Sequence, residues 1–273
     1  MTTLIEKGQK FRDLHLSGEP FVLANAWDAG SARMLEQVGH IAIGTTSAGF
    51  AFSEGGLDNL MGSDEIIENG RIIAEATNLP VSGDLENGFG DTPEAAAKTM
   101  TLAAKAGMVG GSIEDSTNGG ATLQYELAQA KDRVVAAVEA ARSVAHPFTV
   151  TARAENYLIG QTDIGDVITR LQHYQEAGAD VLYAPGVIDP NEVRQIVSSV
   201  DRPVNVVVGL SGIVPTVDAF KKMGVARLSI GSAFARLAYG EVIRSAESIL
   251  ESGSFTSLKN AMPYGEIFDR LKS

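Results

Sequence analysis

Acidic side chains gather where short apolar runs of the sequence end. Asp84 and Glu86 lie near the end of the run Val81–Asn87, and Glu114 lies near the end of Met108–Asp115. Residues i and i+2 of a strand point to the same face, so Asp84 and Glu86 are predicted to project together, with Glu114 on the neighbouring strand. Carboxylates held side by side repel one another unless a cation lies between them. An all-oxygen set favours Mg²⁺, or Mn²⁺ in its place; the alternative is that these acids cap helices or pair with arginines.

One cation also ends an apolar run. Arg153 lies two residues before Glu155 in the run Phe148–Glu155, and its planar fork suits a substrate carboxylate. The alternative, compatible with the first, is an ion pair with Glu155 or Glu114. The loop predicted over Thr45–Gly49 offers hydroxyls and successive backbone N–H groups that could surround an anionic group, although such loops also serve simply as turns.

Composition excludes several other chemistries. The chain has no cysteine, which removes disulfides, thiolate metal sites and cysteine nucleophiles. The four histidines fall before strands or on helical patterns, and none of the lysines ends a predicted strand, which disfavours histidine catalysis and Schiff-base chemistry. A net charge of −12 opposes binding to nucleic acids and anionic membranes. Without a membrane-length apolar stretch or a signal-like start, a cytoplasmic protein is expected.

The elements that would position these side chains alternate between short strands and helices. Eight Val- and Ile-rich runs are each followed by a helical pattern, which predicts a (β/α)8 barrel; an open, doubly wound sheet is the alternative. A helix near Thr3–Ser17 is predicted to close the bottom, and residues 1–273 are predicted to form one domain with a helical tail over 241–273. The predicted strands are Phe21–Trp27, Ile41–Ser47, Val81–Asn87, Met108–Asp115, Phe148–Glu155, Val181–Gly186, Val204–Gly209 and Arg227–Gly231.

Five segments, taken in order, make the chain resemble the isocitrate lyase and phosphoenolpyruvate mutase superfamily over nearly its whole length. The resemblance implies a barrel that binds Mg²⁺ and a small 2-oxo acid or dicarboxylate. It also implies a homo-oligomer, a dimer or more often a tetramer, whose eighth helix is swapped between subunits. The segments are Asn25–Arg33, Ile43–Gly49, Gly83–Gly90, Ile113–Asp115 and Thr151–Arg153.

The resemblance also assigns roles to single residues. Asp58, Asp84, Glu86 and Glu114 correspond to acids that hold the metal directly or through water. Arg153, Asp58 and Asn118 are candidate catalytic residues, Asn118 (with Thr117) as the counterpart of a gating-loop residue. The residues implied to contact substrate are Thr45, Ser47, Ala48, Gly49, Arg153, Asn205 and Arg227, the last two being weaker matches.

Departures from the family pattern narrow the expected reaction. Isocitrate and methylisocitrate lyases carry a gating-loop cysteine as the proton donor, whereas the corresponding segment here, Asp115–Gln124, contains no Cys, His or Lys. Those two activities are therefore not expected. A Mg²⁺-dependent carbon–carbon lyase or oxaloacetate-type decarboxylase acting through a pyruvate-type enolate is expected first. The alternatives are a phosphonopyruvate mutase or hydrolase, and a protein that binds a 2-oxo acid such as 2-oxoglutarate without efficient turnover.

Overall fold

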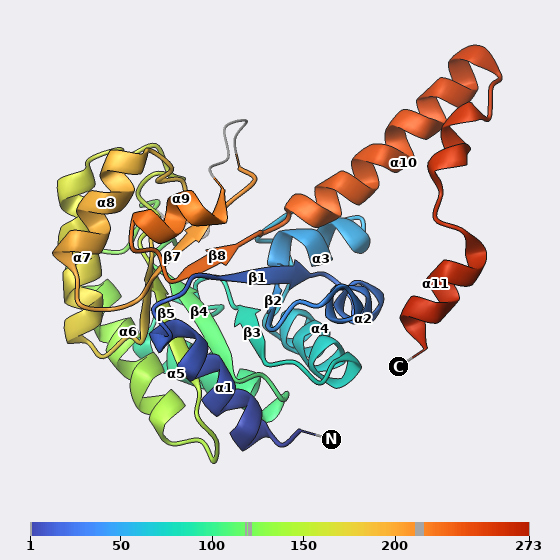
Figure 1. The fold of residues 1–273 in the computed structure, drawn as a ribbon. Coiled ribbons are helices and arrows are strands. Elements are labelled where there is room, and N and C mark those ends of the chain that lie inside the picture. Colours follow the sequence, from blue (N-terminus) through green and yellow to red (C-terminus); the bar gives the residue numbers. More distant parts are fainter. Residues whose placement is uncertain (1, 118, 120–121, 211–215, 273) are drawn as a thin grey trace.

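Eight parallel strands close into a barrel, in which each strand pairs with its neighbours in sequence and β1 pairs with β8 (Figure 1). The computed structural model describes residues 2–117, 119, 122–210 and 216–272. The predicted (β/α)8 fold is confirmed, and the open sheet is excluded. The strands are β1 (Phe21–Ala26), β2 (Ile43–Thr45), β3 (Val81–Asp84), β4 (Gly110–Glu114), β5 (Thr149–Arg153), β6 (Val181–Tyr183), β7 (Val204–Val207) and β8 (Arg227–Ser229).

Helices surround the barrel, and their ends follow local sequence signals. Asp189 caps α8 ahead of Pro190, and Gly39 ends α2 with a φ of 105°, both as the sequence predicts. The helices are α1 (Leu4–Leu16), α2 (Ala29–Val38), α3 (Ser47–Ser53), α4 (Ser63–Ala76), α5 (Pro93–Lys105), α6 (Leu127–Arg142), α7 (Ile164–Glu176), α8 (Pro190–Ser199), α9 (Val217–Lys222), α10 (Ala233–Ser252), the 3₁₀ helix η1 (Thr256–Asn260) and α11 (Tyr264–Leu271).

Helix α1 closes the bottom of the barrel, as predicted. Thr3 caps its start in a capping box with Glu6, and Phe11 on its inner face is fully buried. Phe11 fits against Gly110 of β4, where an added Cβ would lie 2.8 Å from the ring. Because one end of the barrel is blocked in this way, a ligand would enter from the carboxyl ends of the strands, the usual position of the active site in this architecture.

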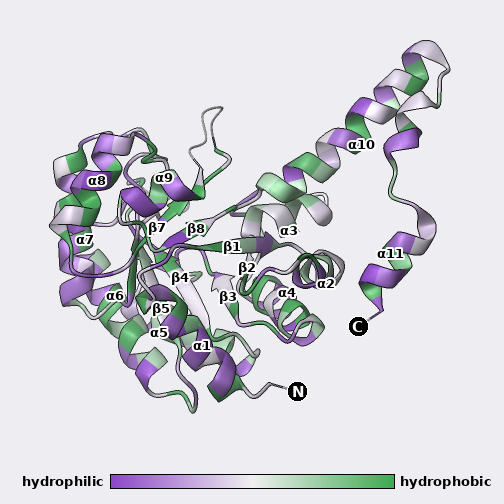
Figure 2. Ribbon diagram, in the orientation of Figure 1, coloured by the Kyte–Doolittle hydropathy of each residue, from purple (hydrophilic) through white to green (hydrophobic). Residues whose placement is uncertain are grey.

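The tail leaves the barrel as a long arm. Helix α10 projects outward, and α11 returns to contact α2 (Figure 1). Apolar segments are distributed along the arm (Figure 2), and Leu250 and Tyr264 are 86% and 80% exposed. No helix in the described part of the chain is long and apolar enough to span a membrane.

Candidate functional site

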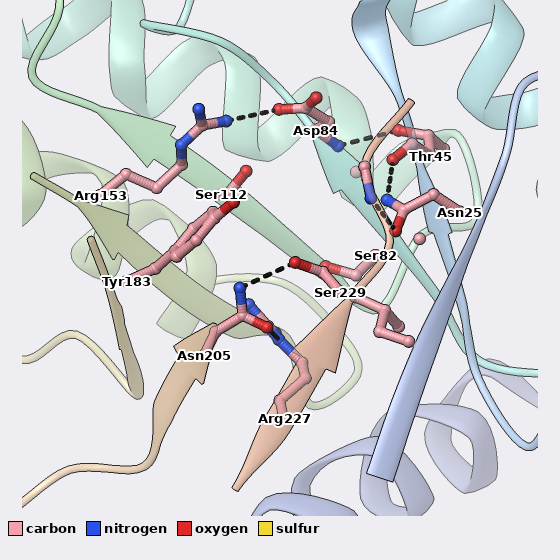
Figure 3. Close-up of a pocket in the computed structure, with 14 residues that line it drawn as sticks. Asn25, Thr45, Ser82, Asp84, Ser112, Arg153, Tyr183, Asn205, Arg227 and Ser229 are labelled. Atoms are coloured by element: carbon pink, nitrogen blue, oxygen red, sulfur yellow. Dashed lines mark hydrogen bonds and ion pairs between the residues drawn. The ribbon is translucent and has the colours of Figure 1, made fainter. Parts of the chain in front are cut away.

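A polar cavity of about 60 Å³ lies inside the barrel and opens toward the carboxyl ends of the strands. Figure 3 shows Asp84 and Arg153 at one end of this cavity and Asn205 and Arg227 at the other. The interiors of such barrels are usually filled by branched apolar side chains, so a polar interior marks this region as a candidate site. The lining residues are Leu23, Asn25, Gly44, Thr45, Ser82, Gly83, Asp84, Ser112, Arg153, Tyr183, Asn205, Arg227, Ser229 and Gly231.

Asp84 is the acid that links the predicted residues at the mouth of the cavity. The Ser47 hydroxyl lies 3.0 Å from Asp84 Oδ2 and 3.2 Å from Asp58 Oδ1, and so bridges the two carboxylates. The Ser47 backbone N–H also donates to Asp84 Oδ2, at 3.2 Å, while the Asp84 N–H donates to Thr45 Oγ1 at 2.8 Å. The structure therefore brings Thr45, Ser47, Asp58 and Asp84 together.

Arg153 sits among three carboxylates. Its Nη1 lies 2.8 Å from Asp84 Oδ1, its Nη2 lies 2.9 Å from Glu114 Oε2, and its Nε lies 2.8 Å from Glu155 Oε1. The side chain is only 13% exposed, so solvent screens these pairs weakly. The predicted ion pairs of Arg153 with Glu114 and Glu155 are thus both present. The guanidinium thus joins acids at, or just after, the ends of β3, β4 and β5. Arg153 also lines the cavity.

Asp58, Glu86 and Glu114 hold protons more tightly than free carboxylates. Burial, followed by the charges of Asp84 and Asp58, raises the pKa of Glu86 from 4.5 to about 8. Burial and the neighbouring Asp84 also raise the pKa of Asp58. Burial raises the pKa of Glu114 well above its usual value, even though Arg153 opposes this shift. Like charges are therefore crowded at this point, and one further cation would relieve the repulsion.

These donors fit a hydrated divalent ion better than a closed protein cage. Among the described residues, no three carboxylate or imidazole side chains converge closely enough to hold an ion by themselves. Mg²⁺ commonly binds through one or two carboxylates and keeps waters or substrate oxygens as its remaining ligands. Asp84 supplies such a set together with Asp58 and Glu86, since its charge helps to raise the pKa of both. The residues present are therefore compatible with Mg²⁺ or Mn²⁺.

Two local predictions are corrected by the structure. Strand β3 ends at Asp84, and Glu86 follows in a turn with a φ of 49°, so Asp84 and Glu86 do not share a strand face as predicted. Ser47, Ala48 and Gly49 form the first turn of α3 rather than a loop, because Thr46 caps that helix by accepting a hydrogen bond from the Gly49 N–H. Gly49 is also closely packed: an added Cβ would lie 2.6 Å from Thr46.

Asn205 and Arg227 lie deeper in the barrel than the acids. Arg227 Nε donates to Asn205 Oδ1 at 2.8 Å and Nη2 donates to Thr151 Oγ1 at 3.1 Å, while Nη1 lies 3.2 Å from His15 Nε2 of α1. Burial lowers the pKa of Arg227 to about 10, and burial, followed by the Arg227 charge, lowers that of His15 to about 3. This pair lines the cavity from below, separated from the cluster at the mouth. Asn118 lies outside the described residues.

Uncharged residues of the cavity wall were not predicted from the sequence. Ser82 and Ser112 lie two residues before Asp84 and Glu114 on their strands, and Ser229 lies two residues after Arg227. That two-residue spacing alone places each serine on the inward face of its strand. Tyr183 also lines the cavity, and its ring centroid lies 5.2 Å from the Arg153 guanidinium carbon.

The chain is similar to known proteins over most of its length. The model of the phosphoenolpyruvate phosphomutase family matches residues 11–250. A Burkholderia cenocepacia J2315 protein, described provisionally as a lyase or mutase, has a crystal structure that aligns with a TM-score of 0.97 at 45% identity, over 99% of this chain and 97% of that one. An uncharacterized protein of Mycobacterium tuberculosis is 34% identical over 96% of this chain and 95% of its own. The 2-methylisocitrate lyase of Escherichia coli is 28% identical over 74% of this chain and 70% of its own.

Proteins of several named activities share the fold. At 22% and 24% identity, solved structures include oxaloacetate acetylhydrolase with oxalate and phosphonopyruvate hydrolase with oxalate and Mg²⁺. The fold alone does not select among such activities. The family match over residues 11–250 identifies this chain as a member of the phosphoenolpyruvate phosphomutase family.

Proposed function

We propose that this protein is a Mg²⁺-dependent enzyme that cleaves a carbon–carbon bond in a small 2-oxo or 2-hydroxy dicarboxylate, with oxaloacetate decarboxylation as the first candidate reaction. The observation that carries the proposal is the cluster of Asp58, Asp84 and Glu86 beside Arg153. It combines oxygen donors for a hard cation with a guanidinium for substrate oxygens. Membership of a family whose solved relatives include enzymes bound to oxalate supports a substrate of this size.

The residues around the cavity are assigned different roles in this proposal. Asp84, with Asp58, Glu86 and Glu114 through water, would hold the ion, which when bound supplies Lewis-acid stabilisation of an enolate oxygen. Arg153 would bind substrate oxygens, held in orientation by Glu114 and Glu155. Thr45 and the first turn of α3, Ser47–Gly49, would contact the substrate carboxylate, and Asn205 and Arg227 would line the inner wall.

Decarboxylation also agrees with the absence of cysteine from the sequence. The sequence has no cysteine to act as the proton donor found in isocitrate and methylisocitrate lyases. When oxaloacetate loses CO₂, the bond between C3 and C4 breaks, its electron pair passes into the pyruvate enolate, and C3 then takes a proton from water. No thiol acid is needed for the bond cleavage. Oxaloacetate decarboxylation is therefore favoured over the thiol-dependent reactions of the family.

The exposed arm supports a homo-oligomer, a dimer or a tetramer with helix exchange. Among the described residues of α10, only Ala235 is buried, while Leu237, Val242 and Leu250 are exposed. Apolar surface of this extent on a projecting helix is typical of a protein interface. A second copy of the chain, offering the same surface, would cover it.

The proposed activity is tested by following oxaloacetate decay. Purified protein with Mg²⁺ is expected to convert oxaloacetate to equimolar pyruvate much faster than Mg²⁺ alone, and EDTA is expected to abolish the enzymatic part. Decay at the rate of Mg²⁺ alone would refute the proposal. Release of phosphate or phosphoenolpyruvate from phosphonopyruvate, in place of pyruvate from oxaloacetate, would assign the protein to carbon–phosphorus chemistry instead.

Divalent-ion binding is expected to strengthen with rising pH. Glu86, with its pKa raised from 4.5 to about 8, must lose a proton before it can help to hold the ion. The affinity for Mg²⁺ should therefore rise by up to about tenfold per pH unit from pH 6 to 8 and level off above. Since the folded state of the metal-free protein binds this proton more tightly than the unfolded state, its stability should fall over the same interval. Calorimetric titrations of the wild type and of Glu86→Gln test this, and an equal, flat profile for both would contradict it.

A further inference from the structure

The loop between β3 and α5 carries Glu86 in a backbone conformation that glutamate rarely adopts. Glu86 and Phe89 have φ values of 49° and 56°, and Gly88 between them has 79°. The left-handed region costs a non-glycine residue about 1–2 kcal/mol, so the surrounding structure must hold this loop in place. In the described part of the chain, the other non-glycine residue with positive φ is Asn59, next to Asp58. Backbone strain is thus concentrated beside the candidate metal-holding acids.

Arg133 of α6 holds this loop from behind. The side chain is 1% exposed, and its Nη1 donates to the carbonyl oxygens of Gly90, at 2.6 Å, and Thr92, at 3.2 Å. Its Nη2 donates to the carbonyl oxygen of Asn87, the residue directly after Glu86. A planar guanidinium can serve several carbonyls at once, whereas a lysine ammonium in the same place lacks the fork that spans them. A buried cation is therefore used to fix the path of this loop.

Tyr125 also contacts this loop. Its ring centroid lies 4.3 Å from the Arg133 guanidinium carbon. Its hydroxyl donates to Asp91 Oδ1 at 2.7 Å and accepts from Asn87 Nδ2 at 3.1 Å. Arg133 and Tyr125 therefore contact both ends of the loop, while Glu86 at its start faces the opposite side, where Asp84 and Asp58 raise its pKa.

From these contacts we infer that Arg133 and Tyr125 are positioning residues for the divalent-ion site, acting through the backbone of residues 87–92 to keep the Glu86 carboxylate beside Asp84 and Asp58. The inference rests on the proposed function, which assigns the ion to these acids. Supporting groups behind metal ligands typically change metal affinity 10- to 100-fold when they are removed. Neither residue lines the candidate cavity, so each would act on the ion by geometry alone.

The same helix offers a matched control. Arg142, in the last turn of α6, donates to the carbonyl oxygens of Phe148, at 3.1 Å, and Gly178, at 3.4 Å, before strands β5 and β6. Unlike Arg133, it is 41% exposed and also pairs with Asp180 at 2.6 Å, but it likewise bonds to loop carbonyls, at the opposite end of the barrel from the acids. Arg133→Met and Arg142→Met should both lower the melting temperature, and only Arg133→Met should disturb the ion site.

The test is a titration of the full chain with Mn²⁺, read by electron paramagnetic resonance without substrate. Arg133→Met is expected to weaken Mn²⁺ binding about 10- to 100-fold, and Arg142→Met to leave it within about twofold of wild type. Tyr125→Phe, which keeps the ring and removes only the hydroxyl, should weaken binding several-fold and decides the matter if Arg133→Met does not fold.

Two results would overturn the inference, and they differ. If Tyr125→Phe and Arg133→Met bind Mn²⁺ as tightly as wild type, or no more weakly than Arg142→Met, the loop contacts are purely structural. If the wild type itself binds no Mn²⁺, the proposed function fails, and the inference fails with it.

Discussion

Replacing Asp84 by asparagine is expected to reduce kcat/KM for oxaloacetate by at least about a thousandfold, since metal stabilisation of a developing enolate contributes several kcal/mol and each 1.36 kcal/mol is a factor of ten. Asp84 is the acid that contacts Ser47 and Arg153 and that raises the pKa of both Asp58 and Glu86. The change is isosteric. It relieves repulsion among the acids but replaces one of two accepting oxygens, which face Arg153 and Ser47, by an N–H group, so the fold should form with a modest loss of stability.

The measurement pairs turnover with Mn²⁺ affinity and a thermal melt. Asp189→Asn is a matched control, because it makes the same isosteric change near the carboxyl ends of the strands and asparagine caps a helix as well as aspartate. It should leave turnover unchanged. Turnover by Asp84→Asn within tenfold of wild type would show that the ion is held elsewhere or is not used.

Replacing Arg153 by methionine is expected to abolish turnover and to destabilise the protein by about 3–5 kcal/mol at pH 8, the usual cost of leaving buried charges unpaired. Glu114 and Glu155 are buried and lose their partner in this variant. Because burial already raises the pKa of both acids, they can take up protons when the pH falls. The stability lost relative to wild type should therefore be smaller at pH 5 than at pH 8.

Urea unfolding at the two pH values measures this difference. Arg153→Lys separates charge from geometry: it should recover part of the stability, since a cation remains, and still lose at least about a hundredfold in kcat/KM, since one ammonium cannot replace the three-way fork. Equal destabilisation of Arg153→Met at pH 5 and pH 8 would show that Glu114 and Glu155 are not held by this arginine. Near-normal turnover of Arg153→Lys would remove the proposed role in orienting substrate.

The fold could be predicted because its signals are local and repeated. Each apolar run is long enough for one strand, and residues such as Gly39 and Asp189 mark helix ends by their own backbone and side-chain chemistry. The ends of the strands were less predictable. The run Val81–Asn87 reads as one strand, yet β3 stops at Asp84, because Arg133 and Tyr125, distant in sequence, hold the following residues in a turn.

The candidate site, like the fold, could be predicted only in part from the sequence. The acids and Arg153 could be found because charged residues directly follow apolar runs in the sequence and the barrel brings neighbouring strand ends together. Their actual pairing, with the guanidinium between Asp84, Glu114 and Glu155, depends on side-chain packing that no spacing rule encodes. The buried link between Arg227 and His15 of α1 joins residues from the two ends of the chain and has no sequence signal.

The central claim is that a divalent ion and a 2-oxo acid bind together at Asp84 beside Arg153. Crystals soaked with Mn²⁺ and oxalate, an unreactive stand-in for the 2-oxo acid, test this most directly through the anomalous signal of manganese. We expect a manganese peak at bonding distance from the Asp84 carboxylate, with oxalate bound to the manganese and within hydrogen-bonding reach of Arg153. Manganese at another set of residues, or oxalate bound at the barrel mouth without metal, would contradict it.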